Sequence, residues 1–254
     1  MSANPVATTP TAGSSKPDLP LYDGPFAIDG RGWLVVVAAC AVAFAQLVLL
    51  PLPGSPMAQQ WVHAILLPAI PLAALAWAAP RGWTGIFRKV GPRQVAQMLG
   101  FGVLNLTVTF GVAIGLNGLI GGNANPAGDI LGDASAGERV QFFLASIPQL
   151  LGEELITILP LLAILSVLVC RFGWTRRAAL ATAWIGTAVM FGLLHLPTYD
   201  WNILQCLLYI GLARVFLTLA YVVTRNLWVS TGAHIVNDWT MFSVPMLLSG
   251  AALI

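Results

Sequence analysis

Long apolar segments follow one another along most of this sequence, and they restrict the fold more than any other feature. A helix of about 20 apolar residues is long enough to cross the hydrocarbon core of a bilayer. Backbone polar groups in lipid must be satisfied internally, so such segments are predicted to be helices. The predicted fold class is therefore all-α, a polytopic transmembrane helix bundle of about seven to eight spans. The candidate spans are 33–52, 61–79, 95–121, 140–169, 177–197, 202–224 and 227–252.

The composition agrees with a chain that is surrounded mainly by membrane lipids. Only 9% of its residues are charged and 57% are hydrophobic, whereas a soluble domain has about 25% charged residues. The net charge of +2 is too small to indicate a nucleic-acid partner. Cys40, Cys170 and Cys206 are far apart and form no CxxC pair, which argues against a disulfide framework or a zinc–thiolate site.

The first thirty residues differ from the rest. They are rich in Pro, Ser, Thr and Ala and contain no apolar core. This composition predicts a disordered tail, and the segment lacks the h-region of a secretory signal peptide. Residues 31–254 are predicted to form the transmembrane domain.

The basic residues predict how the spans are oriented. When the connections between seven spans are assigned alternately to the two sides of the membrane, ten Lys and Arg residues fall on one side. Arg139 is the one arginine assigned to the other side, where it accompanies several acids. The positive-inside rule then predicts a cytoplasmic N-terminus. We expect a multi-pass integral membrane protein of a bacterial plasma membrane. The ten residues are Lys16, Arg31, Arg81, Arg88, Lys89, Arg93, Arg171, Arg176, Arg177 and Arg225.

A few ionisable residues lie inside the predicted spans. A charge at the centre of a transmembrane helix costs about 2.5–3.5 kcal/mol on insertion scales, so intramembrane acids usually face the protein interior or a hydrated cavity and mark function. The alternative is a structural ion-pair network that includes Arg214. The residues concerned are Glu153, Glu154, His195, Arg214, His234 and Asp238.

Helical spacing groups the polar positions of three spans. Residues four apart share a helix face, whereas Glu154 lies about 100° around the helix from Glu153. A straight-helix estimate places Glu153 and Asp238 near mid-membrane and His195 close to the outer surface. The groups with four-residue spacing are Gln149, Glu153 and Thr157; Phe191 and His195; and His234 and Asp238.

These groups resemble the motifs of the CAAX protease and bacteriocin-processing family of intramembrane proteases (CPBP, or Abi). That family has EExxxR, FxxxH and HxxxN or HxxxD motifs on separate transmembrane helices. This sequence reads EELITI at 153–158, FGLLH at 191–195 and HIVND at 234–238, in the same order. The resemblance covers about residues 140–240.

The sequence departs from the family pattern at one position. Ile158 stands where the motif arginine is expected. At the last motif position the sequence has Asp238, preceded by Asn237. We hypothesise that Arg214, on another predicted span, supplies the missing positive charge.

The resemblance implies an intramembrane endopeptidase whose substrate is a peptide or protein segment near the membrane, with a role in peptide processing or bacteriocin self-immunity. Glu153 would be the general base that activates water, assisted by Glu154 and His195. His234, with Asp238 or Asn237, would polarise the scissile carbonyl. The sequence contains no Gly-x-Ser-x-Gly motif, which argues against a serine nucleophile.

Two alternatives remain open at the level of sequence. The first concerns the organiser of the site, because Glu153, His195 and His234 are also suitable ligands for zinc or another divalent metal, and the family is commonly described as metal-dependent. The second is a non-enzymatic function, either proton-coupled transport or immunity by binding, since intramembrane Glu and His suit a proton relay. No convincing internal repeat of the kind seen in transporters is present.

Overall fold

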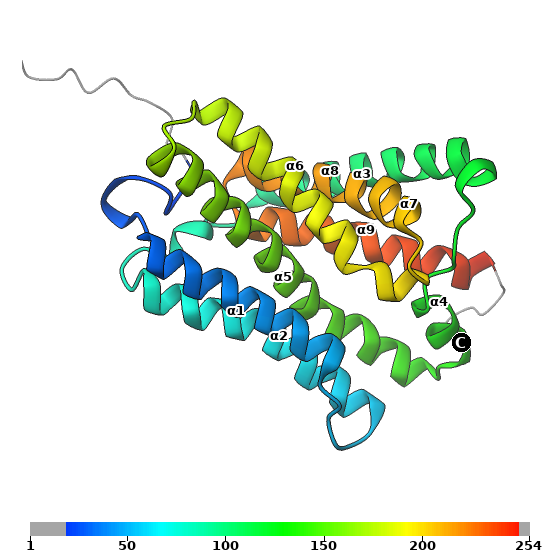
Figure 1. Ribbon diagram of the computed structural model, residues 1–254. Coiled ribbons are helices and arrows are strands. Elements are labelled where there is room, and N and C mark those ends of the chain that lie inside the picture. Colours follow the sequence, from blue (N-terminus) through cyan, green and yellow to red (C-terminus); the bar gives the residue numbers. More distant parts are fainter. Residues whose placement is uncertain (1–18, 249–254) are drawn as a thin grey trace, which may run out of the picture.

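The computed structural model describes residues 19–248, apart from the side chains of 117–120 and 245–248. Helices account for all the regular structure in this part of the chain (Figure 1). Wider π-helical turns extend α5 over Val167–Arg171 and join α7 to α8 over Cys206–Gly211. The helices are α1 Gly30–Leu49, α2 Pro56–Ala78, α3 Pro92–Ile120, α4 Ala127–Asp133, α5 Ala136–Ser166, α6 Arg176–Leu194, α7 Ile203–Gln205, α8 Leu212–Thr224 and α9 Leu227–Leu248.

Within the described residues, six helical stretches are long and apolar enough to cross a membrane. They confirm the predicted polytopic helix bundle, and the protein is an integral membrane protein. The seventh predicted span, 227–252, is represented by α9, which falls outside the set of six and carries the polar residues His234, Asn237 and Asp238. Residues 249–252 of that predicted span lie outside the described residues. The six stretches are Gly30–Leu49, Pro56–Ala78, Pro92–Leu116, Ala136–Arg171, Arg176–Leu194 and Ile203–Thr224.

Helix α5 passes through the middle of the bundle, with α1 and α2 on one side and α6 on the other (Figure 1). A capping box fixes its start, since the Ser135 hydroxyl accepts from the backbone N–H of Glu138 and the Glu138 carboxylate accepts from the backbone N–H of Ser135. From Gly152 onward nearly every residue of α5 is buried. The paired glutamates therefore lie at the point where α5 enters the closed part of the bundle.

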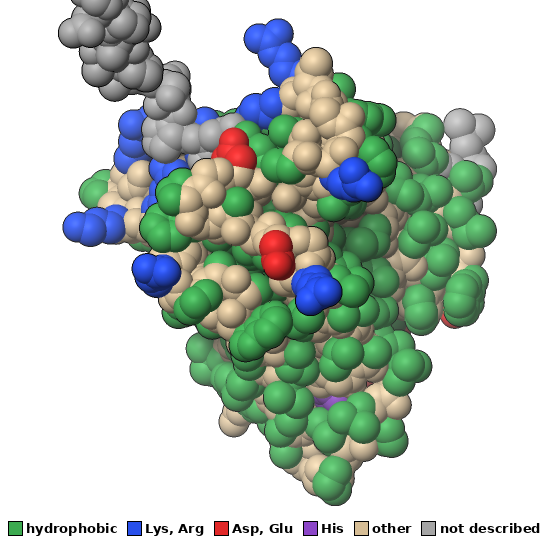
Figure 2. All heavy atoms as spheres, turned by 60° about the vertical axis from the view of Figure 1, so that its left-hand side comes forward, with side chains coloured by type: hydrophobic (Ala, Val, Ile, Leu, Met, Phe, Trp, Pro, Cys, Tyr) green, Lys and Arg blue, Asp and Glu red, His purple; other side chains and the backbone are tan. Residues whose placement is uncertain are grey.

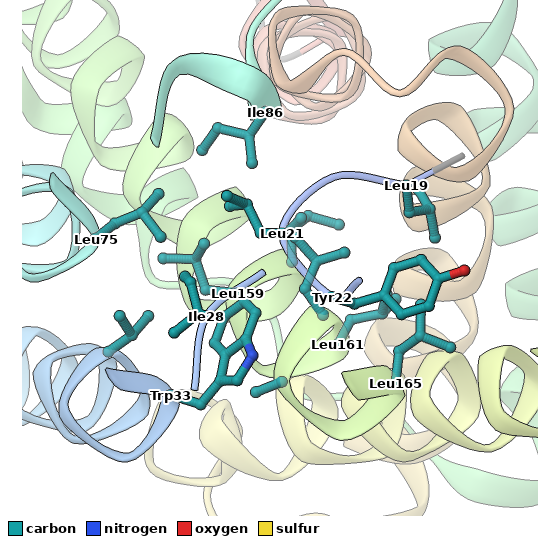
Figure 3. Packing of buried hydrophobic residues seen from close by; sticks show 14 of the residues in the cluster. Leu19, Leu21, Tyr22, Ile28, Trp33, Leu75, Ile86, Leu159, Leu161 and Leu165 are labelled. Carbon is teal, nitrogen blue, oxygen red and sulfur yellow. The ribbon is translucent and has the colours of Figure 1, made fainter. Parts of the chain in front are cut away.

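The segment that precedes α1 is part of the hydrophobic core. Leu19, Leu21, Tyr22 and Ile28 are buried and pack near Leu159 of α5 (Figure 3). The Tyr22 carbonyl accepts hydrogen bonds from the Ser166 hydroxyl and the Cys170 thiol, at 3.3 and 3.4 Å. Packing thus begins before residue 30, where the composition predicted that the disordered tail ends. The four apolar side chains explain this difference, because their burial removes apolar surface from water. Residues 1–18 of the predicted tail lie outside the described part of the chain.

Basic residues gather at one end of the bundle. They lie at the starts of α1, α3 and α6, at the ends of α5 and α8, and in the connection between α2 and α3. Figure 2 shows Lys and Arg side chains around this end, while hydrophobic side chains cover most of the rest of the face in view. We call it the basic end. It includes Arg31, Arg81, Arg88, Lys89, Arg93, Arg171, Arg176, Arg177 and Arg225.

Gly192 allows α6 to approach the π-helical turns very closely. A Cβ atom at this position would lie 2.6 Å from the backbone oxygen of Cys206. Because backbone cannot rotate aside as a side chain can, Gly192→Ala should force the two segments apart, and overpacking of this kind costs about 1–3 kcal/mol. We expect a lower unfolding temperature for the purified variant in detergent. Gly186→Ala on the same helix is the matched control, since its Cβ would meet nothing within 4 Å; equal losses in both variants would contradict the prediction.

Candidate active site

Four helices bring the predicted site residues together around one cavity of about 120 Å³. Helix α5 contributes Glu153, α8 contributes Arg214, and α9 contributes His234 and Asp238. His195 follows the last residue of α6 and lines the same cavity. Residues that are far apart in sequence thus share one polar chamber inside an apolar bundle.

The Glu154 and Arg214 side chains form a fully buried ion pair, with 0% of either side chain exposed. Arg214 Nη1 donates to Glu154 Oε1, and the guanidinium group lies 3.7 Å above the ring of Phe191. Ile158, at the motif position of the arginine, is also fully buried and belongs to the hydrophobic core. A positive charge therefore contacts the second glutamate from a different helix. Whether function depends on this charge stays a prediction.

The buried pair also orients His234. Its Nδ1 lies 3.0 Å from Glu154 Oε1, and because an ionised carboxylate can only accept, Nδ1–H is the donor. A histidine nitrogen that is held in this way fixes both the tautomer and the ring direction. The other nitrogen, Nε2, is then directed towards the remaining acids, 3.8 Å from Glu153 Oε2 and 3.6 Å from Asp238 Oδ1.

Glu153 and Glu154 are neighbours in sequence but have different surroundings. The Glu153 side chain is 14% exposed, whereas that of Glu154 is inaccessible. Gln149 Nε2 donates to Glu153 Oε1 at 3.2 Å, and the Thr157 hydroxyl donates to the Glu153 backbone carbonyl at 2.9 Å. Glu153 is consequently the member of the pair that can reach water or a substrate.

His195 lies at the level of Glu153, and not nearer the outer surface as the straight-helix estimate predicted. Helices α5 and α6 are consecutive and in contact, and the two residues lie nearly the same number of positions from the connection between them. His195 Nδ1–H donates to the Phe191 carbonyl at 2.9 Å. This bond leaves Nε2 of His195 available as an acceptor.

Asn237 connects the site to α3, for which sequence reasoning gave no role in the site. Asn105 Nδ2 donates to Asn237 Oδ1, and Asn237 Nδ2 donates to Asp238 Oδ1, both at 2.9 Å. Asn105 is fully buried. An amide within an otherwise apolar run was the sequence signal for this contact, but no motif contains it. His63 of α2, by contrast, does not line the chamber and pairs with Gln46 of α1 at 2.8 Å.

Replacing Asn105 with leucine should lower activity, because Asn105 holds Asn237, which in turn orients Asp238 beside His234. The substitution leaves the buried Asn237 Oδ1 without its donor, and an unsatisfied buried acceptor costs about 1–3 kcal/mol. We expect a lower kcat at nearly unchanged KM, together with a modest loss of stability in detergent. Thr107→Val is the matched control on α3, because that exposed hydroxyl bonds only to the Val103 carbonyl of its own helix. A wild-type kcat for Asn105→Leu would rule out this positioning role.

A second, larger cavity of about 400 Å³ adjoins the polar chamber. The two share Glu153, Phe191 and His195. Its walls are mainly apolar and come from α1, α5 and α6, so we call it the apolar cavity. Glu153 and His195 therefore lie between a polar chamber and an apolar space that could accept a side chain. The apolar lining consists of Phe44, Leu47, Val48, Pro126, Ile156, Phe191, Leu194 and Pro197.

The connection after α6 is fastened to the connection after α3. Asn125 Nδ2 donates to the Tyr199 hydroxyl at 3.1 Å, and Asn123 Nδ2 donates to the Tyr199 carbonyl at 2.9 Å. Burial raises the pKa of Tyr199 to about 12, so the phenol keeps its proton near neutral pH. Tyr199 and Asn125 both line the polar chamber, and neither was identified from the sequence.

The predicted metal ligands line this chamber without forming a metal cluster. Glu153, His195 and His234 all face it, but within residues 19–248 no three His, Cys, Asp or Glu side chains are grouped as a metal centre requires. The donors as they stand do not fit such a centre. The chemistry proposed below therefore uses a water molecule and the side chains of this chain.

Comparison with known proteins identifies the fragment that carries the motifs. Residues 135–240 match the sequence model of the family described as Type II CAAX prenyl endopeptidase Rce1-like. Over this segment the chain is similar to the CPBP family, as its motifs predicted. The matched segment extends from the capped start of α5 to just beyond Asp238 in α9, so it contains all the motif residues. Searches of curated proteins and of solved structures found no match.

Proposed function

We propose that the protein is an intramembrane endopeptidase that hydrolyses a peptide bond with a water molecule activated by Glu153. The observation that carries the proposal is the convergence of Glu153, His195 and His234 on one chamber beside an apolar cavity. The family match supports endopeptidase activity of the CAAX type. Peptide processing and bacteriocin self-immunity are the biological roles that we expect for it.

In the proposed first step, water is held between the Glu153 carboxylate and Nε2 of His195. Glu153 accepts one water proton as general base while the water oxygen bonds to the scissile carbonyl carbon. The carbonyl π electrons move to oxygen and give a tetrahedral intermediate. Gln149, which donates to Glu153 Oε1, orients the carboxylate for this step.

In the proposed second step, the oxyanion is stabilised and the amine leaves. A protonated His234 donates a hydrogen bond through Nε2–H to the oxyanion. Its Nδ1–H continues to donate to Glu154, and Asn237 lines the same chamber. The carbon–nitrogen bond then breaks as the carbonyl re-forms, and the leaving nitrogen takes the proton from Glu153. One peptide bond and one water are converted to a carboxyl and an amine, with the enzyme unchanged.

The metalloprotease alternative would require the predicted ligands Glu153, His195 and His234 to gather more closely than they do in this structure. A divalent metal held by them would supply Lewis-acid polarisation of the carbonyl. Metal content is measured directly by elemental analysis of purified protein. Stoichiometric zinc or another metal that is lost in Glu153→Ala would favour the metalloprotease form. Wild-type hydrolysis in metal-free protein would favour water activation by side chains alone.

The test of the proposed function compares the peptides in membranes that contain the wild type or Glu153→Ala at equal protein levels. We expect specific cleavage products with the wild type alone. An unchanged peptide profile combined with an ion flux that Glu153→Ala abolishes would support the transporter alternative. An immunity phenotype that survives in Glu153→Ala would support action by binding.

A further inference from the structure

The two ends of the bundle differ in their access to the site. Towards the basic end, the space next to Glu154 is filled by residues of α5 with 0% exposure, namely Leu155, Ile158, Leu159 and Leu162. The segment 19–28 packs into the same cluster (Figure 3). No residue that lines the apolar cavity belongs to the basic end. The described residues therefore close the site on that side.

Towards the opposite end, the apolar cavity has a mouth. Val48 lies in the last turn of α1, Pro126 between α3 and α4, and Pro197 and Thr198 just beyond α6; all four line the cavity and are exposed. Helices α1 and α6 both start at the basic end, at Arg31 and Arg176, so their last turns lie at the far end of the bundle (Figure 1). The cavity consequently opens away from the basic end.

The charge pattern assigns a side of the membrane to this mouth. Basic residues near span ends are retained on the cytoplasmic side, and nine of the ten basic residues that the sequence placed together are found at the described basic end. The acids Asp129, Asp133 and Asp200 lie in or near the connections at the opposite end. The side of the membrane that the mouth faces is therefore the non-cytoplasmic one.

We infer that the site takes its substrate from the non-cytoplasmic side, as a peptide segment with a bulky apolar side chain next to the scissile bond. This inference rests on the proposed function and adds the side and the chemistry of the substrate. Phe44, Leu47 and Ile156 supply the apolar lining for that side chain, and Glu153 at the boundary of the two cavities meets the adjacent carbonyl. A cytoplasmic prenylated carboxyl terminus would meet the closed end.

The test labels single cysteines from one side of the membrane. In a chain whose Cys40, Cys170 and Cys206 are replaced by alanine, Thr198→Cys marks the mouth and Arg93→Cys marks the basic end, where Arg93 is exposed. A membrane-impermeant maleimide is added to right-side-out and inverted membrane vesicles. We expect Thr198→Cys to react in right-side-out vesicles and Arg93→Cys in inverted ones. Reaction of Thr198→Cys in inverted vesicles alone, or of both cysteines from the same side, would overturn the inference.

A protection experiment tests the substrate chemistry without requiring catalysis. Excess synthetic peptide with a central Leu-Leu-Phe should slow labelling of Thr198→Cys severalfold and leave Arg93→Cys unaffected, whereas a Ser-Gly peptide of equal length should protect neither. Absence of protection would remove the substrate part of the inference. Because labelling and protection are independent of hydrolysis, they also report on sidedness if the proposed activity fails. Pro197→Cys and Lys89→Cys replace the first pair if either variant does not accumulate.

Discussion

Glu153→Gln should abolish peptide hydrolysis while the protein accumulates and folds normally. The amide has nearly the same shape as the carboxylate but cannot accept the water proton, and a positioned general base contributes about 10²–10⁴-fold to the rate. The side chain is partly exposed, and His234 Nε2 lies 3.8 Å from Glu153 Oε2, beyond hydrogen-bond distance, so little stability should depend on the charge of Glu153. The measurement is kcat with purified protein in detergent, together with the unfolding temperature.

The matched control removes a negative charge close to the site without changing the chamber. Asp200 is exposed and has a left-handed backbone, which asparagine tolerates well. Asp200→Asn should therefore keep wild-type kcat. Hydrolysis by Glu153→Gln at more than about one tenth of the wild-type rate would be incompatible with a general-base role, by the same magnitude.

Arg214→Leu should have the opposite profile and lose stability first. The substitution leaves the fully buried Glu154 carboxylate without its guanidinium partner, and breaking one side of a buried ion pair costs about 3–5 kcal/mol. His234 would also lose its fixed orientation, because the Glu154 carboxylate that accepts from its Nδ1–H would no longer be held in place by Arg214. We expect little accumulated protein, a strongly lowered unfolding free energy and no detectable hydrolysis.

The double variant Glu154→Leu with Arg214→Leu distinguishes loss of the pair from loss of packing. Replacing both partners by apolar residues removes the uncompensated charge, and such exchanges are often nearly neutral for stability. The double variant should therefore unfold at a higher temperature than Arg214→Leu alone, yet remain inactive because His234 is no longer held. Additive destabilisation by the two substitutions would contradict a coupled pair.

Much of the bundle was predictable because lipid imposes simple rules on sequence. An apolar run of sufficient length is helical in a membrane, and the first six predicted spans match described helices to within a few residues. Motif spacing pointed to Glu153, His195 and His234 as site residues. This was possible because each motif lies within a single helix, where residues four apart share a face. The hypothesis about Arg214 arose from the motif arginine that is missing at Ile158 and from the cost of a lone intramembrane cation, which requires a partner.

The remaining features depend on contacts between distant segments. Asn105 lies 132 positions from the Asn237 that it holds, and a single amide in an apolar run does not reveal its partner. The four buried apolar residues of the segment 19–28 were too few to predict from sequence that this segment packs against the bundle. The depth of His195 in the membrane depends on how α6 packs against α5. The straight-helix estimate considers one helix at a time and therefore does not contain this information.

The adjacent acids of α5 set a limit on how the protein can change in length. A single inserted or deleted residue rotates everything beyond it by about 100° around the helix axis. An insertion or deletion between Pro148 and Glu153 would therefore turn the Glu153 carboxylate away from the chamber. It would also break the contact between the Glu154 carboxylate and Arg214. The fold can accommodate single substitutions in that stretch, but the number of residues in it should not change, because this number fixes the directions of both carboxylates.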